Sequence, residues 1–167
     1  MNCTAEMLRL YAVTDRTWVG EQTLPQQVEA ALKGGATCVQ LREKDLGDAA
    51  ILAEALEISA LCKRYGVPFI LNDNVALARQ CGADGVHLGQ EDMDPAEARR
   101  ILGPEAIIGV SDVPVFCGVG GGLTNGIRSA SMAAYVEHQG AYGVVCNSKI
   151  DVDTIHFIKE AVEIPVV

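Results

Sequence analysis

The chain has 167 residues, of which 49% are hydrophobic and 21% charged, a composition typical of one globular domain. Its 13 Lys and Arg against 22 Asp and Glu give a formal net charge of -9, which disfavours binding to nucleic acid or to an anionic membrane surface. No apolar run reaches the roughly 20 residues of a transmembrane helix, and the first residues lack a signal-peptide pattern. We therefore expect a single cytoplasmic domain, residues 1–167, whose anionic ligands are held by local charges, amides or metal.

Short β-rich runs alternate with longer helical patterns along the chain. In chain order the runs are Leu8–Val13, Cys38–Leu41, Pro68–Leu71, Gly85–Leu88, Ala106–Val110, Val115–Val119, Gly143–Cys146 and Ile164–Val167. Such alternation predicts parallel strands joined by crossover helices. A helix that ends in Gly-Ala precedes a strand three times, at Gly35, Gly82 and Gly140, which indicates a repeated unit. The predicted fold class is therefore α/β, of the parallel (β/α) TIM-barrel type.

The helices between the first strands carry recognisable start and stop signals. Thr23 with Gln26 three residues later predicts a capping box, and Gly34-Gly35 ends the helix that follows. The next helix is expected over Asp48–Tyr65, with an apolar face that includes Leu56, and Gly66 ends it.

One stretch does not fit a regular barrel. Only four residues separate Ala106–Val110 from Val115–Val119, whereas a parallel crossover needs about a dozen. A full barrel also usually exceeds 200 residues. We therefore predict a fold that is incomplete or rearranged after residue 111, through a lost βα unit, one bent strand, or two joined fragments. Open sheet edges in such a fold predict a homo-oligomer.

Polar residues follow several of the runs, at the strand ends where barrel sites are built. Asp73 and Asp92 offer carboxylate oxygens to a Mg²⁺ ion that bridges to phosphate. Arg42 and Lys44 supply positive charge for the phosphates. The remaining candidates are the amides of Gln40 and Asn72 and the hydroxyl of Ser111, which can donate hydrogen bonds.

Each candidate also has a purely structural interpretation. Asp73 and Asp92 each precede a helical pattern and could be helix N-caps, and Asp94 directly before Pro95 favours that role. Arg42 and Lys44 could be solvated loop charges, and His87 could be a core histidine bonded to a backbone carbonyl. Their joint position at consecutive strand ends favours an anion site.

The same segments carry a resemblance to the thiamine-phosphate synthase family, over residues 1–111. The matching phrases are Leu10–Asp15, Val39–Lys44, Ile70–Asp73, Gly85–Asp92 and Ile107–Ser111. The resemblance implies joining of hydroxymethylpyrimidine diphosphate to thiazole phosphate with release of pyrophosphate. It implies that Gln40, Arg42, Lys44 and Asn72 bind the diphosphate substrate and that Asp73 and Asp92 hold Mg²⁺. It further implies that Arg42, Lys44 and Ser111 act on the reacting groups.

Residues 112–167 depart from the family pattern. A Gly-rich stretch, Gly118–Gly122, makes Gly121 and Gly122 candidate phosphate-binding residues, although a flexible turn or a junction explains it equally well. Either Pro114–Gly122 and Gly143–Ser148 are late family strands after a deletion, or Ser131–Val167 is a unit spliced from another barrel. A catalytically inactive scaffold and a thiazole tautomerase-like paralogue, which needs no diphosphate, are therefore alternative functions.

Overall fold

The computed structural model describes residues 3–89, 91–112, 143–146, 160 and 163. The chain divides into two compact units. The first unit is Met1–His87 with Ile101–Ile107, and the second unit is Leu88–Arg100 with Ile108–Val167. In the described part of the chain, each helix is too short or too polar to cross a membrane.

Strands and helices alternate as the sequence predicts. The elements are η1 (Ala5–Leu8), β1 (Tyr11–Val13), η2 (Arg16–Trp18), α1 (Leu24–Lys33), β2 (Cys38–Leu41), α2 (Asp48–Tyr65), β3 (Phe69–Asn72), α3 (Val75–Cys81), β4 (Gly85–Leu88), α4 (Pro95–Leu102), β5 (Ile107–Asp112) and β6 (Gly143–Cys146). The predicted first strand is too long at its start, because Leu8 belongs to the 3-10 turn η1. The predicted runs Val115–Val119 and Ile164–Val167 lie outside the described residues.

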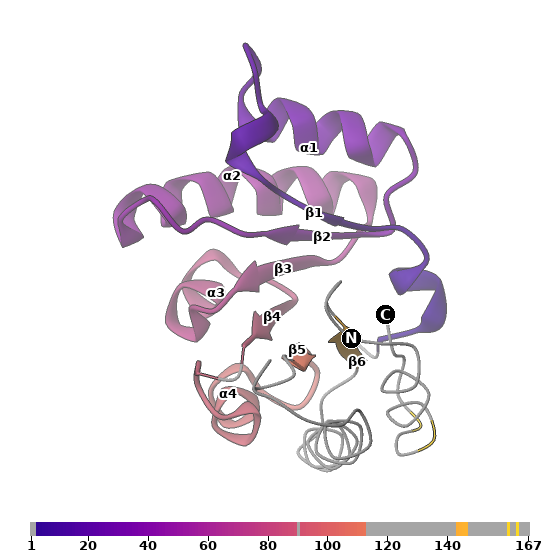
Figure 1. Cartoon of the computed structure of the whole chain (residues 1–167), viewed down its shortest axis with the longest axis vertical. Helices are drawn as coiled ribbons and strands as arrows, with labels where there is room; N and C mark the ends of the chain where they lie inside the picture. Colours follow the sequence, from indigo (N-terminus) through magenta and orange to yellow (C-terminus); the bar gives the residue numbers. More distant parts are fainter. Residues whose placement is uncertain (1–2, 90, 113–142, 147–159, 161–162, 164–167) are drawn as a thin grey trace, which may run out of the picture. The chain divides into compact units, whose positions relative to one another are not determined.

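The strands of the first unit pair in parallel and in chain order. β1 pairs with β2, β2 with β3, and β3 with β4. Helices α1, α2 and α3 lie against one face of these strands, where α2 contacts β2 and β3 (Figure 1). Parallel pairing aligns the carboxyl ends of the strands at one edge of the sheet, which brings the loops that follow β2 and β3 together.

The start and stop signals read from the sequence operate as predicted. Oγ1 of Thr23 accepts a hydrogen bond from the backbone N–H of Gln26, and Oε1 of Gln26 accepts one from the backbone N–H of Thr23, so the capping box of α1 is confirmed. Helix α2 has the predicted bounds and ends at Gly66, whose φ of 68° is left-handed. The predicted apolar face is wrong at Leu56, which is 50% exposed, because Ala55 and Ile58 turn inward instead.

Side chains of the first-unit sheet alternate between two apolar layers. Val39 lies with Val28 of α1 around a small cavity on the helix-covered face. On the opposite face, Cys38, Ile70 and Ile107 form a buried cluster against which Met7 and Tyr11 pack. Burial there raises the pKa of the Cys38 thiol to about 12, and four described cysteines (Cys3, Cys38, Cys62 and Cys81) are free thiols.

The beginning of β4 lies against the backbone of the chain leading into β5. Ile107 donates its backbone N–H to the carbonyl oxygen of Asp84 at 2.8 Å. A Cβ atom built on Gly85 would lie 1.8 Å from the carbonyl oxygen of Ile107, far inside any van der Waals contact. Only glycine therefore fits at position 85.

In the second unit, β5 pairs directly with β6 in parallel, with Ser111 opposite Val145. Residues 113–142 lie outside the described residues, so both interpretations of the tail stay predictions. Strand β5 extends to Asp112, so Ser111 lies within the strand instead of just after it.

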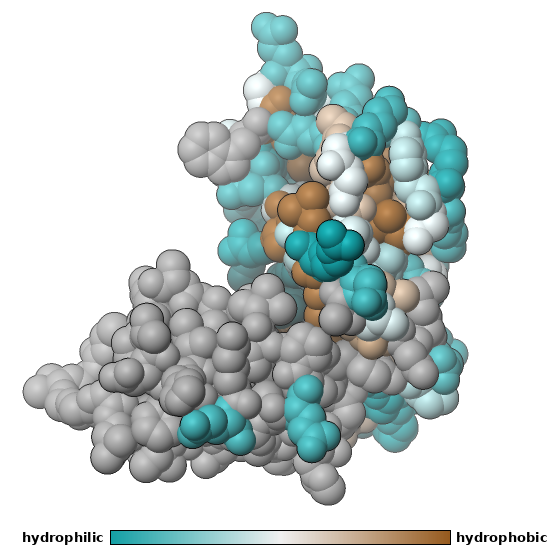
Figure 2. All heavy atoms as spheres, turned by 90° about the vertical axis from the view of Figure 1, so that its right-hand side faces the viewer, coloured by the Kyte–Doolittle hydropathy of each residue, from teal (hydrophilic) through white to brown (hydrophobic). Residues whose placement is uncertain are grey.

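Apolar side chains also reach the surface of the described residues. Leu10 and Val13, beside and within β1, are 52% and 50% exposed. Figure 2 shows apolar atoms in brown on one face of the described residues, bordered by hydrophilic atoms in teal. The predicted homo-oligomer stays a prediction.

Candidate functional site

Two predicted amides meet on one face of the first-unit sheet. Gln40 of β2 pairs in register with Ile70, and Asn72 lies two residues further along β3 on the same face. Gln40 is 3% exposed, and its Nε2 donates to Oδ1 of Asn72 at 2.6 Å. Because Asn72 accepts through Oδ1, its Nδ2 group is the one that remains to donate to an anion.

Tyr11 of β1 fixes the orientation of this amide pair. Its hydroxyl donates to Oε1 of Gln40 at 2.9 Å. Burial raises the pKa of the Tyr11 hydroxyl well above its usual value, so the phenol stays neutral and keeps its proton. Because Oε1 of Gln40 accepts from Tyr11, its Nε2 faces Asn72. Hydrogen bonds are thus donated from Tyr11 to Gln40 and from Gln40 to Asn72.

The loop after β2 carries the two predicted phosphate-binding cations. Thr14, directly after β1, bonds to both backbone groups of Arg42. Its Oγ1 accepts from Arg42 N at 2.9 Å and donates to Arg42 O at 3.4 Å. The Arg42 side chain itself is exposed. The backbone of Arg42 is therefore tied to the neighbouring strand, while its guanidinium remains accessible to a ligand.

Lys44 reaches the predicted metal ligand that follows β3. Its Nζ lies 3.8 Å from Oδ2 of Asp73, and both side chains are partly exposed, at 56% and 37%. Such an exposed contact contributes little stability, so it does not explain why the two groups meet. Lys can bind phosphate as a point charge, and a carboxylate can bind a hard cation.

Asp73 has an unusual backbone conformation. Its φ is 61°. Among the described residues other than glycine, no other residue has a positive φ. Its N–H donates to the carbonyl oxygen of His87 at 2.8 Å, which holds the residue between β3 and β4. Left-handed backbone in a residue other than glycine is concentrated at functional sites. The helix-cap alternative for Asp73 is wrong, because Asn74 caps α3.

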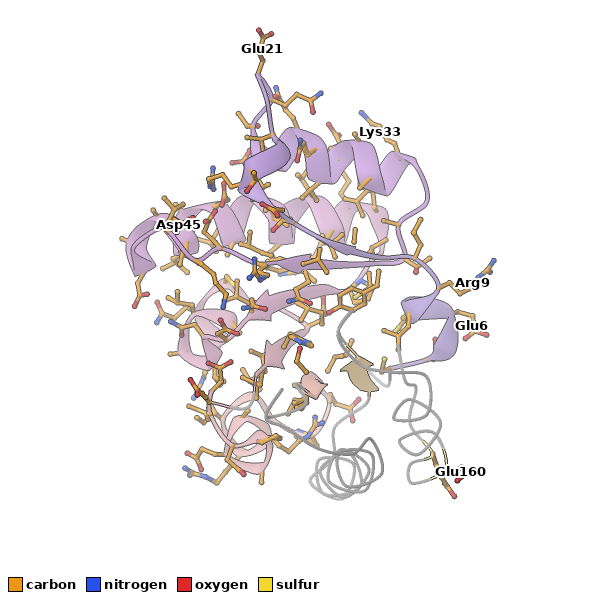
Figure 3. The ribbon with its side chains drawn as sticks, viewed as in Figure 1. Glu6, Arg9, Glu21, Lys33, Asp45 and Glu160 are labelled. Atoms are coloured by element: carbon orange, nitrogen blue, oxygen red, sulfur yellow. The ribbon has the colours of Figure 1, made fainter. Side chains whose placement is uncertain are left out.

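A hollow of about 340 Å³ opens beside this loop. Its lining residues lie in the segments that follow β1 and β2 and are Asp15, Arg16, Thr17, Arg42, Glu43, Lys44 and Asp45. Figure 3 shows Asp45, next to Lys44, beyond the arrowheads of the strands, and Lys33 toward their other end. The predicted cations therefore border an accessible space at the carboxyl ends of the strands.

Two further predicted residues belong to the second unit. Oδ2 of Asp92 accepts the backbone N–H of Gly89 at 2.7 Å, and Ser111 lies in β5 and is partly exposed. The cap expected at Asp94 is confirmed, since its carboxylate accepts from Ala96 and Glu97. Asp92 is thus not the cap of α4. Gly121 and Gly122 lie outside the described residues.

The described side chains contain no group of three or more metal-binding residues, so a metal here depends on fewer protein ligands. Asp73 fits such a role because its carboxylate is a hard oxygen donor that is partly open to solvent. Mg²⁺ in phosphate sites commonly takes one or two carboxylates, with waters and phosphate oxygens completing its shell. The carboxylate of Asp73 therefore fits the kind of oxygen donor that Mg²⁺ takes.

Sequence reasoning missed the residues that position the site. Thr14 and Tyr11 lie within a segment that resembles the family. Neither pattern nor spacing indicates that Thr14 bonds to Arg42 or that Tyr11 bonds to Gln40. Glu43 stands between two predicted site residues, and strand alternation would have placed it on the opposite side from them.

Comparison with known families assigns the chain. A family model described as thiamine monophosphate synthase matches residues 10–113. The chain belongs to this family. It is 51% identical over 106 residues to thiamine-phosphate synthase of Albidiferax ferrireducens, covering 64% of this chain and 48% of that protein. The chain thus spans about half the length of this relative.

Two other members of the thiamine monophosphate synthase family align with nearly the whole chain. Thiamine-phosphate synthase of Caldanaerobacter subterraneus is 36% identical over 169 positions, which cover 95% of this chain and 72% of that protein. The solved structure of thiamine phosphate pyrophosphorylase from Pyrococcus furiosus is 30% identical with a TM-score of 0.77, covering 96% of this chain and 74% of that one. The predicted parallel α/β fold of TIM-barrel type is therefore confirmed.

Proposed function

We propose that this chain provides the substrate site of a magnesium-dependent thiamine phosphate synthase. The reaction joins hydroxymethylpyrimidine diphosphate to thiazole phosphate and releases pyrophosphate. Family membership supports this proposal. The observation that carries it is the approach of Lys44 to Asp73 at 3.8 Å, beside the bonded amides of Gln40 and Asn72, at the ends of adjacent strands.

The chemistry required is a substitution at the pyrimidine methylene carbon. The carbon–oxygen bond to the diphosphate breaks, and the thiazole nitrogen forms a new carbon–nitrogen bond to the same carbon. Such a reaction depends mainly on neutralising the leaving pyrophosphate. Arg42 and Lys44 border the hollow and supply that positive charge. Asn72 donates to the bound diphosphate through Nδ2, and Ser111 contacts the reacting groups.

Asp73 and Asp92 would hold Mg²⁺ in this proposal. Bound Mg²⁺ would supply Lewis-acid neutralisation of the leaving group. Lys44, 3.8 Å from Asp73, would add its positive charge to the same diphosphate group. The cytoplasmic location expected from the sequence belongs to the same proposal.

Thermal unfolding with inorganic pyrophosphate tests the metal assignment. Pyrophosphate should raise the melting temperature only when Mg²⁺ is present, because the two bind together; ligand at 100 times its Kd stabilises by about 2.7 kcal/mol. Asp73→Asn should abolish the rise, since asparagine tolerates the left-handed backbone but lacks the charge. Asp92→Asn should do the same, while its side-chain oxygen still accepts from Gly89.

Asp94→Asn is the matched control. Asparagine caps a helix as well as aspartate, so this variant should keep both its melting temperature and the full pyrophosphate response. A pyrophosphate response that survives in both Asp73→Asn and Asp92→Asn would refute the metal assignment.

A further inference from the structure

The side chain of Glu43 is buried although the residue stands between two exposed cations. Its side chain is 2% exposed, whereas Arg42 and Lys44 on either side are exposed. Oε2 of Glu43 accepts from Nε of Arg16 at 2.6 Å. A buried carboxylate requires such a partner, because an unpaired charge is strongly disfavoured away from water.

Arg16 links Glu43 to a second carboxylate on α2. Its Nη2 donates to both oxygens of Glu54, at 2.7 and 2.8 Å. The hydrogen bonds to Glu54, and to a smaller extent the one to Glu43, raise the pKa of Arg16 further above its usual value. The three side chains of Arg16, Glu43 and Glu54 therefore connect η2, the loop after β2, and helix α2.

The other oxygen of Glu43 holds the backbone of its own loop. Oε1 accepts from Lys44 N at 3.2 Å and lies 3.5 Å from Asp45 N. Oγ1 of Thr14 accepts from the backbone N–H of Arg42 at 2.9 Å. Hydrogen bonds therefore hold the backbone of this loop at Arg42, Lys44 and Asp45. Nζ of Lys44 lies 3.8 Å from Oδ2 of Asp73.

We propose that Glu43, held by Arg16 and Glu54, is a positioning residue that sets the affinity of the Arg42–Lys44 loop for a diphosphate group. Glu43 does not touch the ligand itself. It acts by orienting the backbone from which Arg42 and Lys44 extend into the hollow, so that less ordering is needed when the anion binds. The inference rests on the proposed function, since it assumes a diphosphate at this loop.

Binding of inorganic pyrophosphate with Mg²⁺ to the full chain, measured by calorimetry, tests this role. Glu43→Gln keeps the shape of the side chain and leaves Arg16 paired with Glu54. It should raise the Kd for pyrophosphate by roughly tenfold, the lower end of the effect seen when supporting partners of a ligand site are removed. Glu29→Gln is the matched control, because Glu29 forms a 2.6 Å ion pair with Arg64 between α1 and α2 and should leave the Kd unchanged.

A double-mutant cycle separates positioning from general stability. If Glu43 acts through the loop, Glu43→Gln should weaken binding much less in a Lys44→Ala background, where one directed cation is already absent. Backbone amides of Lys44 and Asp45 should also exchange hydrogen faster in Glu43→Gln. If that variant does not fold, Glu54→Gln, which retains the contact between Arg16 and Glu43, should raise the Kd in the same direction by a smaller factor.

The outcomes distinguish this inference from the proposed function. An unchanged Kd in Glu43→Gln, or an equal loss with and without Lys44, would overturn the positioning role while wild-type binding upholds the diphosphate site. Absence of pyrophosphate binding in the folded wild-type chain would overturn the proposed function and the positioning role with it.

Discussion

Replacement of Lys44 by alanine should lower kcat/KM for thiamine phosphate formation by about 100-fold, the size of effect expected when one preorganised charge at a leaving group is removed. Lys44 extends from the loop after β2 and reaches 3.8 Å from Asp73, at the place where the proposed pyrophosphate departs. Its side chain is 56% exposed, so its loss should hardly change the free energy of unfolding. Steady-state kinetics with varied diphosphate substrate measures the effect.

Lys33→Ala is the control for this prediction. Lys33 is similarly exposed and also pairs with a carboxylate, Glu29, at 3.5 Å, but it lies toward the opposite end of the strands (Figure 3). The control should retain wild-type kinetics. Equal activity in Lys44→Ala and Lys33→Ala would show that Lys44 has no role at the leaving group.

Gly85→Ala should destabilise the chain by about 3 kcal/mol or more, at the upper end of the cost of overpacking a core. The added methyl group would meet the carbonyl oxygen of Ile107 at 1.8 Å. That oxygen belongs to backbone at the start of β5, so it cannot move aside as a flexible side chain would. Urea denaturation followed by circular dichroism measures the change.

Gly47→Ala provides the comparison. A Cβ atom at Gly47 meets no other atom within 4 Å, and its φ of -76° suits any residue. As an N-cap position it should lose about 1 kcal/mol or less. Equal stability of the Gly85 and Gly47 variants would contradict the close approach of β4 to the Ile107 backbone.

Much of the first unit could be predicted from local sequence signals. The capping box of α1 and the cap at Asp94 are side chain to backbone bonds within a few residues. The end of α2 is set by the left-handed glycine Gly66. Such local signals can be recognised in the sequence. Leu56 was misplaced because the inward face of a long helix depends on its packing partners, and these come from distant parts of the chain. The rearrangement predicted after residue 111 stays a prediction.

Predictability of the site differed between its parts. Gln40 and Asn72 were found because strand alternation and parallel pairing place strand-end residues together, and the structure joins them by a hydrogen bond. The ion pair of Arg16 with Glu43 joins residues 27 positions apart. Hydrophobic periodicity reports only on neighbouring residues, so it cannot predict such a contact. The left-handed backbone of Asp73 was also hidden, because its hydrogen bond reaches across to His87 on the next strand.

The most direct test of the proposed function is turnover by the 167-residue chain. The protein is incubated with hydroxymethylpyrimidine diphosphate, thiazole phosphate and Mg²⁺, and thiamine phosphate is monitored together with released pyrophosphate. We predict equal amounts of the two products and loss of both when Mg²⁺ is chelated. Absence of thiamine phosphate at every concentration of protein that gives a folded circular dichroism spectrum would contradict the synthase proposal and favour an inactive scaffold.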